Sequence, residues 1–238
     1  MKYALQLYSV RDVCTADNLK QTLSALRDMG YEGVETAGSY GLSAEAFKAV
    51  LAECGLVPIS AHERINRFEE DLDGLLDFYS TLGLKTVACS YATTSSAEEV
   101  RHVADVLSKA TERAAARGMR VLYHNHSHEF VPIDGVLPIT RIAEACLLEP
   151  DTYWIFNAKH DPVAFLRDNA ARIGLVHLKD GRNGRPCTIG EGENAVEGIL
   201  DATIALGHDW IVIENDDPKP DGLSDAARSI AALKALKK

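Results

Sequence analysis

The feature that most constrains the fold is a repeating pattern, in which a short apolar run is followed by a longer amphipathic segment. Eight of these runs have the composition of β-strands. The expected strands are residues 3–9, 33–37, 57–62, 86–91, 120–126, 152–157, 173–180 and 210–216. Eight strand–helix units in 238 residues are typical of the (β/α)8 TIM barrel, an α/β fold of about 250 residues. We therefore predict a TIM barrel that occupies residues 1–238 as a single domain.

Helix-start and helix-stop signals support this division of the chain. Ser96 has Glu99 three residues later, which is a capping-box arrangement. Ser43 opens another amphipathic segment, and Pro162 stands in a first helical turn, where its missing N–H is not needed. Gly30 stands where a helix C-cap would. The rival doubly wound sheet is not favoured, because the first strand–helix junction lacks a GxGxxG sequence.

The composition of the chain argues against nucleic acid and membranes as partners. The chain has 25 Lys and Arg against 35 Asp and Glu, a net charge of −10, and it lacks the basic stripe that supplies affinity for nucleic acid. It has no apolar run of about 18 residues that would span a bilayer, and its first residues do not form a leader-peptide pattern. We expect a cytoplasmic protein that acts on a small molecule, without nucleic-acid or membrane partners. Whether it forms a homo-oligomer stays open.

Polar and ionisable side chains gather at the carboxyl ends of the expected strands, where barrel enzymes place their active sites. Unpaired charges are costly on buried strands, so this accumulation indicates a site. The residues are Gln6, Glu35, His62, His124, Asn125, His126, His177, Lys179, Asp180, Glu214 and Asp216. Taken alone, His62 or Glu35 is equally well explained as a solvated or internally paired residue. Asp151 (before the sixth expected strand), His177 and Glu214 belong to three successive strands, and carboxylate with imidazole suits Mn, Co, Zn or Mg.

An ordered set of short motifs resembles a known family. The motifs are LQLYSVRD, YHNHSHEF, DTYW, DPV, HLKD, GEGE and IVIENDDP, and they extend from Leu5 to about Pro220. In this order and spacing they resemble the sugar phosphate isomerase/epimerase group of the xylose-isomerase-like TIM barrel superfamily. The same superfamily includes hydroxypyruvate isomerase, ketose 3-epimerases, inosose dehydratase and endonuclease IV. The set is specific for the superfamily and does not specify the substrate.

The resemblance implies one divalent metal ion at the rim of the barrel. Its ligands would be a glutamate from strand 5, an aspartate from strand 6, a histidine from strand 7 and a glutamate from strand 8. The last three fall on Asp151, His177 and Glu214. The first would be Glu129, His124 or His126, and we prefer Glu129. In an extended strand the two histidines share one face and Glu129 lies on the other, so they cannot all reach one ion unless the chain turns.

The chemistry implied by the resemblance is isomerisation or epimerisation of a small sugar, sugar phosphate or keto-acid through an enediolate. A metal ion stabilises the enediolate, and two carboxylates, Glu214 and Glu129, would act as general base and acid. The side chains expected to contact the carbohydrate substrate are His124, His126, Trp154, Lys179, Glu35 and His62.

Three other functions compete with this one. The same residues would serve a lyase, dehydratase or hydrolase that acts on a keto-sugar or inositol derivative, for instance if the enediolate expelled a β-hydroxyl group. A catalytically silent binding barrel would hold no metal. An endonuclease is disfavoured, because Trp154 stands where the three-zinc relative has a histidine and residues 179–186 supply no Asp-x-His pair.

Overall fold

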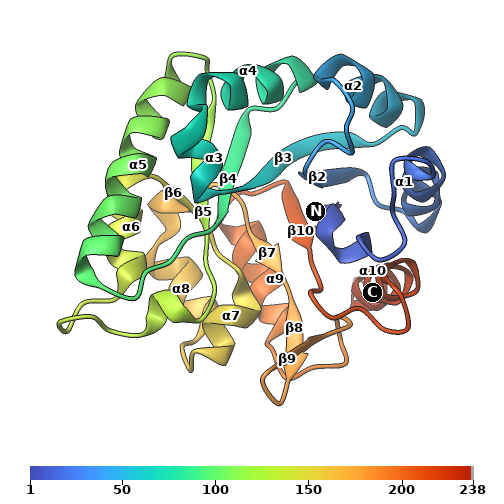
Figure 1. Cartoon of the computed structure of the whole chain (residues 1–238). Helices are drawn as coiled ribbons and strands as arrows, with labels where there is room; N and C mark the ends of the chain where they lie inside the picture. The colour runs from blue at the N-terminus through green and yellow to red at the C-terminus, as the bar shows by residue number, and fades with distance from the viewer. Residues whose placement is uncertain (237–238) are drawn as a thin grey trace.

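The computed structural model describes residues 1–236 and shows a parallel barrel surrounded by helices (Figure 1). The barrel strands are β1 (Lys2–Gln6), β2 (Gly33–Ala37), β3 (Val57–Arg64), β4 (Thr86–Tyr91), β5 (Arg120–His124), β6 (Leu147–Glu149), β7 (His177–Leu178) and β10 (Trp210–Ile213). The α-helices are α1 (Leu19–Met29), α2 (Ala44–Glu53), α3 (Ile65–Glu70), α4 (Leu72–Leu82), α5 (Ala97–Ala115), α6 (Pro138–Ala145), α7 (Thr152–Asn157), α8 (Pro162–Asp168), α9 (Val196–Ala205) and α10 (Gly222–Leu236). The 3-10 helices are η1 (Leu7–Val10), η2 (His128–Phe130) and η3 (Ala170–Arg172).

The strand order confirms the predicted (β/α)8 barrel. Around the sheet the strands follow as β6, β5, β4, β3, β2, β1, β10 and β7, and each neighbouring pair is parallel. The two edge strands meet through single parallel bridges, from Leu148 to Ile173 and from Asp151 to His177, so the barrel is nearly closed. A separate antiparallel hairpin is formed by β8 (Asp180–Arg182) and β9 (Arg185–Cys187). Within residues 1–236, no helix combines the length and the apolar character needed to cross a membrane.

The predicted sixth strand is wrong. Residues 152–157 form helix α7, and the strand is β6 at Leu147–Glu149. The Asp151 side chain accepts hydrogen bonds from the backbone N–H groups of Tyr153 and Trp154, both at 3.0 Å, and so caps the helix. The aromatic and β-branched residues of this segment favour strands, but the cap and the burial of Tyr153 and Ile155 in the core outweigh that propensity.

The helix-start and helix-stop signals are confirmed at each predicted position. The side chain of Ser96 accepts a hydrogen bond from the N–H of Glu99 at 3.2 Å, and Ser43 caps α2 in the same way. Pro162 lies in the first turn of α8. Gly30 ends α1 with a φ of 105°, a left-handed conformation that glycine adopts without steric cost.

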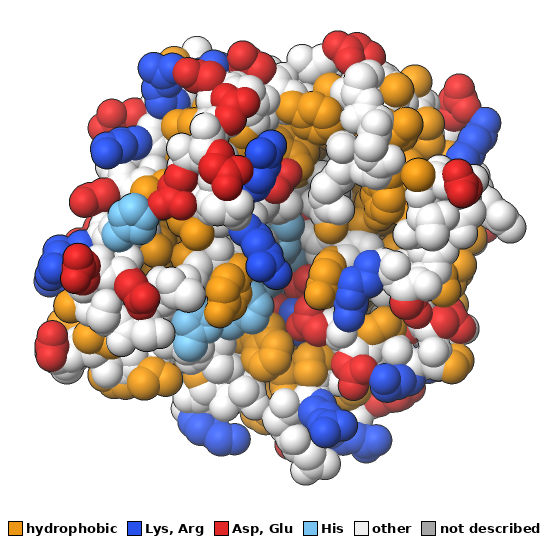
Figure 2. Space-filling view, in the orientation of Figure 1, with side chains coloured by type: hydrophobic (Ala, Val, Ile, Leu, Met, Phe, Trp, Pro, Cys, Tyr) orange, Lys and Arg blue, Asp and Glu red, His pale blue; other side chains and the backbone are white. Residues whose placement is uncertain are grey.

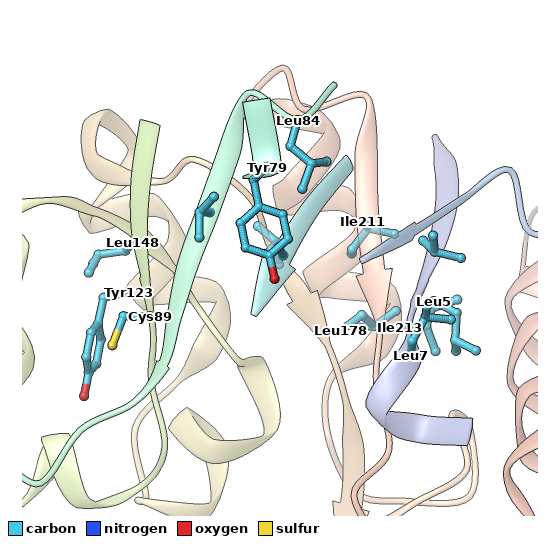
Figure 3. Close-up of a cluster of buried hydrophobic side chains, with 14 of the residues drawn as sticks. Leu5, Leu7, Tyr79, Leu84, Cys89, Tyr123, Leu148, Leu178, Ile211 and Ile213 are labelled. Atoms are coloured by element: carbon cyan, nitrogen blue, oxygen red, sulfur yellow. The ribbon is translucent and has the colours of Figure 1, made fainter. Parts of the chain in front are cut away.

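The main hydrophobic core lies between the strands and the surrounding helices. Outward-facing strand residues, among them Leu5, Leu178, Ile211 and Ile213, belong to one continuous cluster of buried side chains (Figure 3). Full burial of such a side chain is worth about 1.5–3 kcal/mol. This layer fixes the strands against the helices and leaves the barrel interior to a different set of residues.

A second, smaller apolar cluster fills the barrel interior, and we call it the apolar plug. It consists of Ala4, Ala88, Leu122, Leu175 and Val212. Because side chains along a strand alternate between faces, the residue two positions later also points inward. Those residues are Gln6, Ser90, His124, His177 and Glu214. Alternation therefore places a polar layer directly on the apolar plug, at the carboxyl ends of the strands.

Shortening Leu122 to alanine tests the apolar plug. Leu122 has no exposed surface, so Leu122→Ala should lower the free energy of unfolding by about 2–5 kcal/mol through lost burial and the cavity left behind. Leu236 is 43% exposed, and Leu236→Ala, as the matched control, should change it by less than about 0.5 kcal/mol. Urea titration followed by circular dichroism measures both variants. Equal stability of the two would show that the plug does not support the barrel.

Candidate metal centre

A cavity of about 520 Å³ opens at the carboxyl ends of the barrel strands. Its aromatic lining comes from Tyr8, Tyr91 and Trp154. Its histidine and acidic lining includes His62, His124, His126 and Glu214. Figure 2 shows histidine side chains gathered in a hollow near the middle of this face, with acidic side chains beside them. A cavity of this size accommodates a small organic ligand.

Four side chains near this cavity bring possible metal ligands together, and we call them the outer donor set. The set is His124, Asp151, His177 and Glu214, whose ligand atoms lie within 4.8 Å of one another. His177 Nδ1 is 3.0 Å from Glu214 Oε2. His124 Nε2 is 3.7 Å from Asp151 Oδ2 and 3.8 Å from Glu214 Oε2. Such separations are near those of atoms that share one ion at about 2.1 Å.

The ammonium group of Lys179 lies among the carboxylates of this region. Its Nζ is 2.8 Å from Asp151 Oδ2, 2.9 Å from Glu214 Oε2 and 2.7 Å from Asp216 Oδ2. Burial alone would lower the pKa of Lys179, but the three carboxylates outweigh it and raise the pKa well above its ordinary value. Lys179 is therefore charged, and its ammonium group balances part of the negative charge of Asp151 and Glu214.

Three further residues form a network beside the outer donor set, and we call them the inner set. They are Glu35, His62 and Glu149. His62 Nε2 is 2.6 Å from Glu149 Oε2 and 3.1 Å from Glu35 Oε2. His177 reaches the same carboxylates with Nε2, at 2.6 Å from Glu35 and 3.4 Å from Glu149. Neither carboxylate has exposed surface. The imidazole of His177 thus stands between the two sets.

Burial and neighbouring charges set the protonation of these groups. Burial raises the pKa of Glu149 to about 7, and the nearby Glu35 carboxylate adds to the effect. Burial also opposes ionisation of Glu35, but His62 and His177 outweigh it and lower the pKa of Glu35 to about 2. For His177, burial favours the neutral ring, yet Glu149 and Glu35 raise its pKa well above the ordinary value. His177 therefore carries a proton on each nitrogen in this arrangement.

The outer donor set fits a divalent metal ion. It supplies two imidazole nitrogens and two carboxylates, a mixture that suits Zn, Co or Mn better than the all-oxygen shell preferred by Mg. The 3.7 Å and 3.8 Å contacts of His124 Nε2 are too long for hydrogen bonds. Among the described residues the other nitrogen of this ring, Nδ1, is buried without a hydrogen-bond partner.

The structure brings Asp151, His177 and Glu214 together, and it adds His124 from the end of β5. A second group of donors, His62, His124, Glu149 and His177, also has ligand atoms within 4.8 Å of one another. Glu129 belongs to neither this group nor the outer donor set. Its carboxylate accepts hydrogen bonds from Tyr123 Oη at 2.6 Å and from the backbone N–H of His126 at 2.8 Å. Because β5 ends at His124 and the chain turns into η2, Glu129 is held by this turn.

The residues expected to contact substrate fall into two groups. Those that line the cavity are His62, His124, His126 and Trp154. Glu35 and Lys179 have no exposed surface and are absent from its lining. Both contact the outer donor set instead. Glu35 contacts His177, and Lys179 contacts Asp151 and Glu214.

Sequence reasoning misses Glu149. The residue ends β6, whereas the sequence pattern predicts the strand at 152–157. The sequence does contain an indication of this strand. Glu149 follows the apolar residues Leu147 and Leu148, and an acidic residue at the end of a short apolar run is typical of a strand end at the rim of a barrel. Asp216, which binds Lys179, was noted at the rim but given no role.

Comparison with known proteins agrees with this architecture. A family model described as "Xylose isomerase-like TIM barrel" matches residues 23–236. An inosose dehydratase from Clostridium beijerinckii is 25% identical over 196 residues, which cover 71% of this chain and 65% of that protein. The match therefore spans less than two thirds of that relative's length.

Solved structures show the same fold. A sugar phosphate isomerase/epimerase from Parabacteroides distasonis superposes with a TM-score of 0.86 at 21% identity, over 98% of this chain and 93% of that one. The IolI protein, solved with a zinc atom, superposes with a TM-score of 0.80 at 16% identity, over 99% of this chain and 98% of that one.

Proposed function

The chain belongs to the xylose isomerase-like TIM barrel family, and from that membership we propose that it is a divalent-metal-dependent isomerase or epimerase of a small keto sugar. The observation that carries the proposal is the outer donor set beside a polar cavity. Removing a proton from carbon next to a carbonyl requires that the developing negative charge be stabilised, and a bound divalent ion would supply this.

We assign the metal ligands to His124, Asp151, His177 and Glu214. His124 takes the place of Glu129 as the ligand from the end of β5, because its Nε2 lies close to two other donors while the Glu129 carboxylate is engaged by Tyr123 and the His126 backbone. Two nitrogen and two oxygen ligands support Zn, Co or Mn as the ion.

Glu214 is the residue that we assign as general base. It is the carboxylate of the outer donor set that also lines the cavity. Burial opposes its ionisation, but Lys179 and His177 outweigh burial and lower its pKa well below the ordinary value. Glu214 is therefore ionised and can take a proton from a substrate carbon.

The cavity lining supports a polyhydroxy substrate. Burial, together with the charge of Lys179, lowers the pKa of His126 to about 3, so this ring is neutral and can both donate and accept hydrogen bonds to hydroxyl groups. The Trp154 ring lies 5.7 Å from the His126 ring, centre to centre, and offers an apolar face to a sugar chain.

Dehydration is a second candidate, favoured by the relative named inosose dehydratase. Both reactions begin with proton removal by the same base. If the proton is returned to carbon, the product is an isomer or epimer. If a hydroxyl group on the next carbon leaves instead, the product is an unsaturated ketone and water.

Proton exchange with deuterated water tests the proposal and separates the two reactions. Protein reconstituted with Zn, Co or Mn is incubated with small ketoses, keto-acids and keto-inositols, and NMR follows deuterium at the carbon next to the carbonyl. An isomer that carries deuterium supports isomerisation or epimerisation, whereas ultraviolet absorbance of an unsaturated ketone supports dehydration. Absence of exchange and of product with every loaded form would overturn both.

Metal affinity should rise with pH. Because the pKa of His177 is raised well above its ordinary value, the ring is doubly protonated near neutrality and an ion at Nδ1 must displace one proton. Below that pKa the apparent dissociation constant should fall about tenfold per pH unit. Asp151, with a pKa raised by burial to about 6, should steepen the dependence under acidic conditions. Competition against a coloured chelator measures it, and a flat profile would contradict the expectation.

A further inference from the structure

The two nitrogens of the His177 ring face different partners. Nδ1 lies 3.0 Å from Glu214 Oε2, in the outer donor set. Nε2 lies 2.6 Å from Glu35 Oε2, in the inner set. A neutral imidazole carries one N–H and one lone pair, so only one of its nitrogens can bind an ion while the other donates a hydrogen bond.

Glu35 is held rigidly where it meets this ring. Its Oε2 accepts a hydrogen bond from Gln6 Nε2 at 2.6 Å, and its Oε1 accepts one from Ser60 Oγ. These partners come from β1 and β3, the strands on either side of β2. Glu35 has no exposed surface and does not line the cavity, so contact with a substrate does not explain its position.

We propose that Glu35 is a positioning residue, which holds the Nε2 proton of His177 and thereby presents the Nδ1 lone pair to the metal ion. The inference rests on the metal centre of the proposed function and not on any particular substrate. The opposite tautomer would set the Nε2 lone pair against a carboxylate oxygen 2.6 Å away. This is closer than the 3.0 Å between Nδ1 and Glu214 Oε2, so the opposite tautomer suffers the stronger charge repulsion. Carboxylate partners of this kind fix the orientation and raise the basicity of a metal-binding histidine.

The other histidine of the outer donor set lacks such a partner. His124 Nδ1 is 3.7 Å from Glu149 Oε2, beyond hydrogen-bond distance. His62 contacts both inner carboxylates through Nε2 and does not displace His177 from Glu35. Glu149 Oε2 lies farther from His177 Nε2, at 3.4 Å, so Glu35 is the nearer hydrogen-bond partner of this nitrogen.

Metal affinity of Glu35 variants tests the proposal without any substrate. Glu35→Leu removes the acceptor and should weaken zinc binding about 10- to 100-fold. Glu35→Gln removes the charge but keeps a carbonyl oxygen that can accept from Nε2–H, so it should bind more tightly than the leucine variant. Leu51→Ala, which removes a buried side chain of α2 that is not among the contacts of Glu35 or His177, controls for general loss of stability and should bind zinc as the wild type does.

Nitrogen-15 NMR of histidine-labelled protein reports the tautomer itself. His177 is assigned by the signals that disappear in His177→Gln. In protein loaded with cadmium-113, we expect metal coupling at Nδ1 of His177 and a protonated Nε2, with Nε2–H exchange faster in Glu35→Leu.

Three outcomes would overturn the proposal. They are coupling at Nε2, a second ion bound between His177 and the inner set, and zinc affinity of Glu35→Leu within about threefold of wild type, below the range expected for a lost carboxylate partner. Wild-type protein that binds no divalent ion would overturn the metal centre as well. Metal binding with the expected coupling but without turnover would instead leave the inference standing and reject only the proposed reaction.

Discussion

Replacing His177 by alanine is expected to abolish stoichiometric divalent metal in the purified protein. The ring supplies one of the two imidazole nitrogens of the outer donor set and has no exposed surface. Its loss leaves one imidazole and two carboxylates, and it frees Glu35 from its partner on β7. Inductively coupled plasma mass spectrometry after loading with Zn, Co or Mn and desalting gives the metal content per chain.

The matched control is His102→Ala. His102 lies on α5, where its ring pairs with the carboxylate of Glu69 and 62% of the His102 side chain is exposed. It should keep the full metal content. Circular dichroism checks that His177→Ala is folded, and His177→Gln offers a less disruptive second variant. Metal retained at the wild-type level in both His177 variants would remove this residue from the ligand set.

Glu214→Gln should remove substrate proton exchange while the barrel stays folded. Glutamine keeps the size of the side chain but cannot take a proton from carbon, and loss of a general base costs about 10²- to 10⁴-fold in rate. Glu214 contacts Lys179 at 2.9 Å and His177 at 3.0 Å, so metal affinity should also fall. The exchange rate in deuterated water is therefore measured at saturating metal.

Glu144→Gln is the control for this substitution. Glu144 lies on α6, and 63% of its side chain is exposed, so the change should leave exchange unaltered. Exchange by metal-saturated Glu214→Gln at the wild-type rate would place the base elsewhere. Asp151→Asn would then be the next variant to measure, since Asp151 is the other carboxylate of the outer donor set.

The barrel could be predicted from the sequence because eight runs and their caps are local signals. The rim position of His177 and Glu214 follows from the same signals, since parallel strands end at one edge. Asp151 precedes the expected sixth strand, so its place among the ligands follows from the family resemblance and not from the strand pattern. The sixth strand was misplaced because Tyr153, Trp154 and Ile155 favour a strand locally, while the cap and core burial that make them helical are tertiary.

The location of Glu129 depended on a turn that alternation cannot anticipate. The sequence pattern predicts an extended strand through residue 126, but β5 ends at His124 and η2 follows. Likewise, Glu35 and Lys179 were grouped with the substrate contacts because their strand positions resemble those of cavity residues. Their burial depends on contacts between side chains from different strands, which the sequence pattern of a single strand does not predict.

The junction between β6 and β7, where the barrel closes, is formed by two residues of the proposed metal centre. Strand β7 has only two residues, and at this level it meets the β6 side through the single bridge between Asp151 and His177. Both residues are also donors of the outer set, so an ion bound as proposed would link the two sides of this junction. A ligand stabilises the conformation to which it binds, so metal bound at the proposed site would also stabilise the closure of the barrel between β6 and β7.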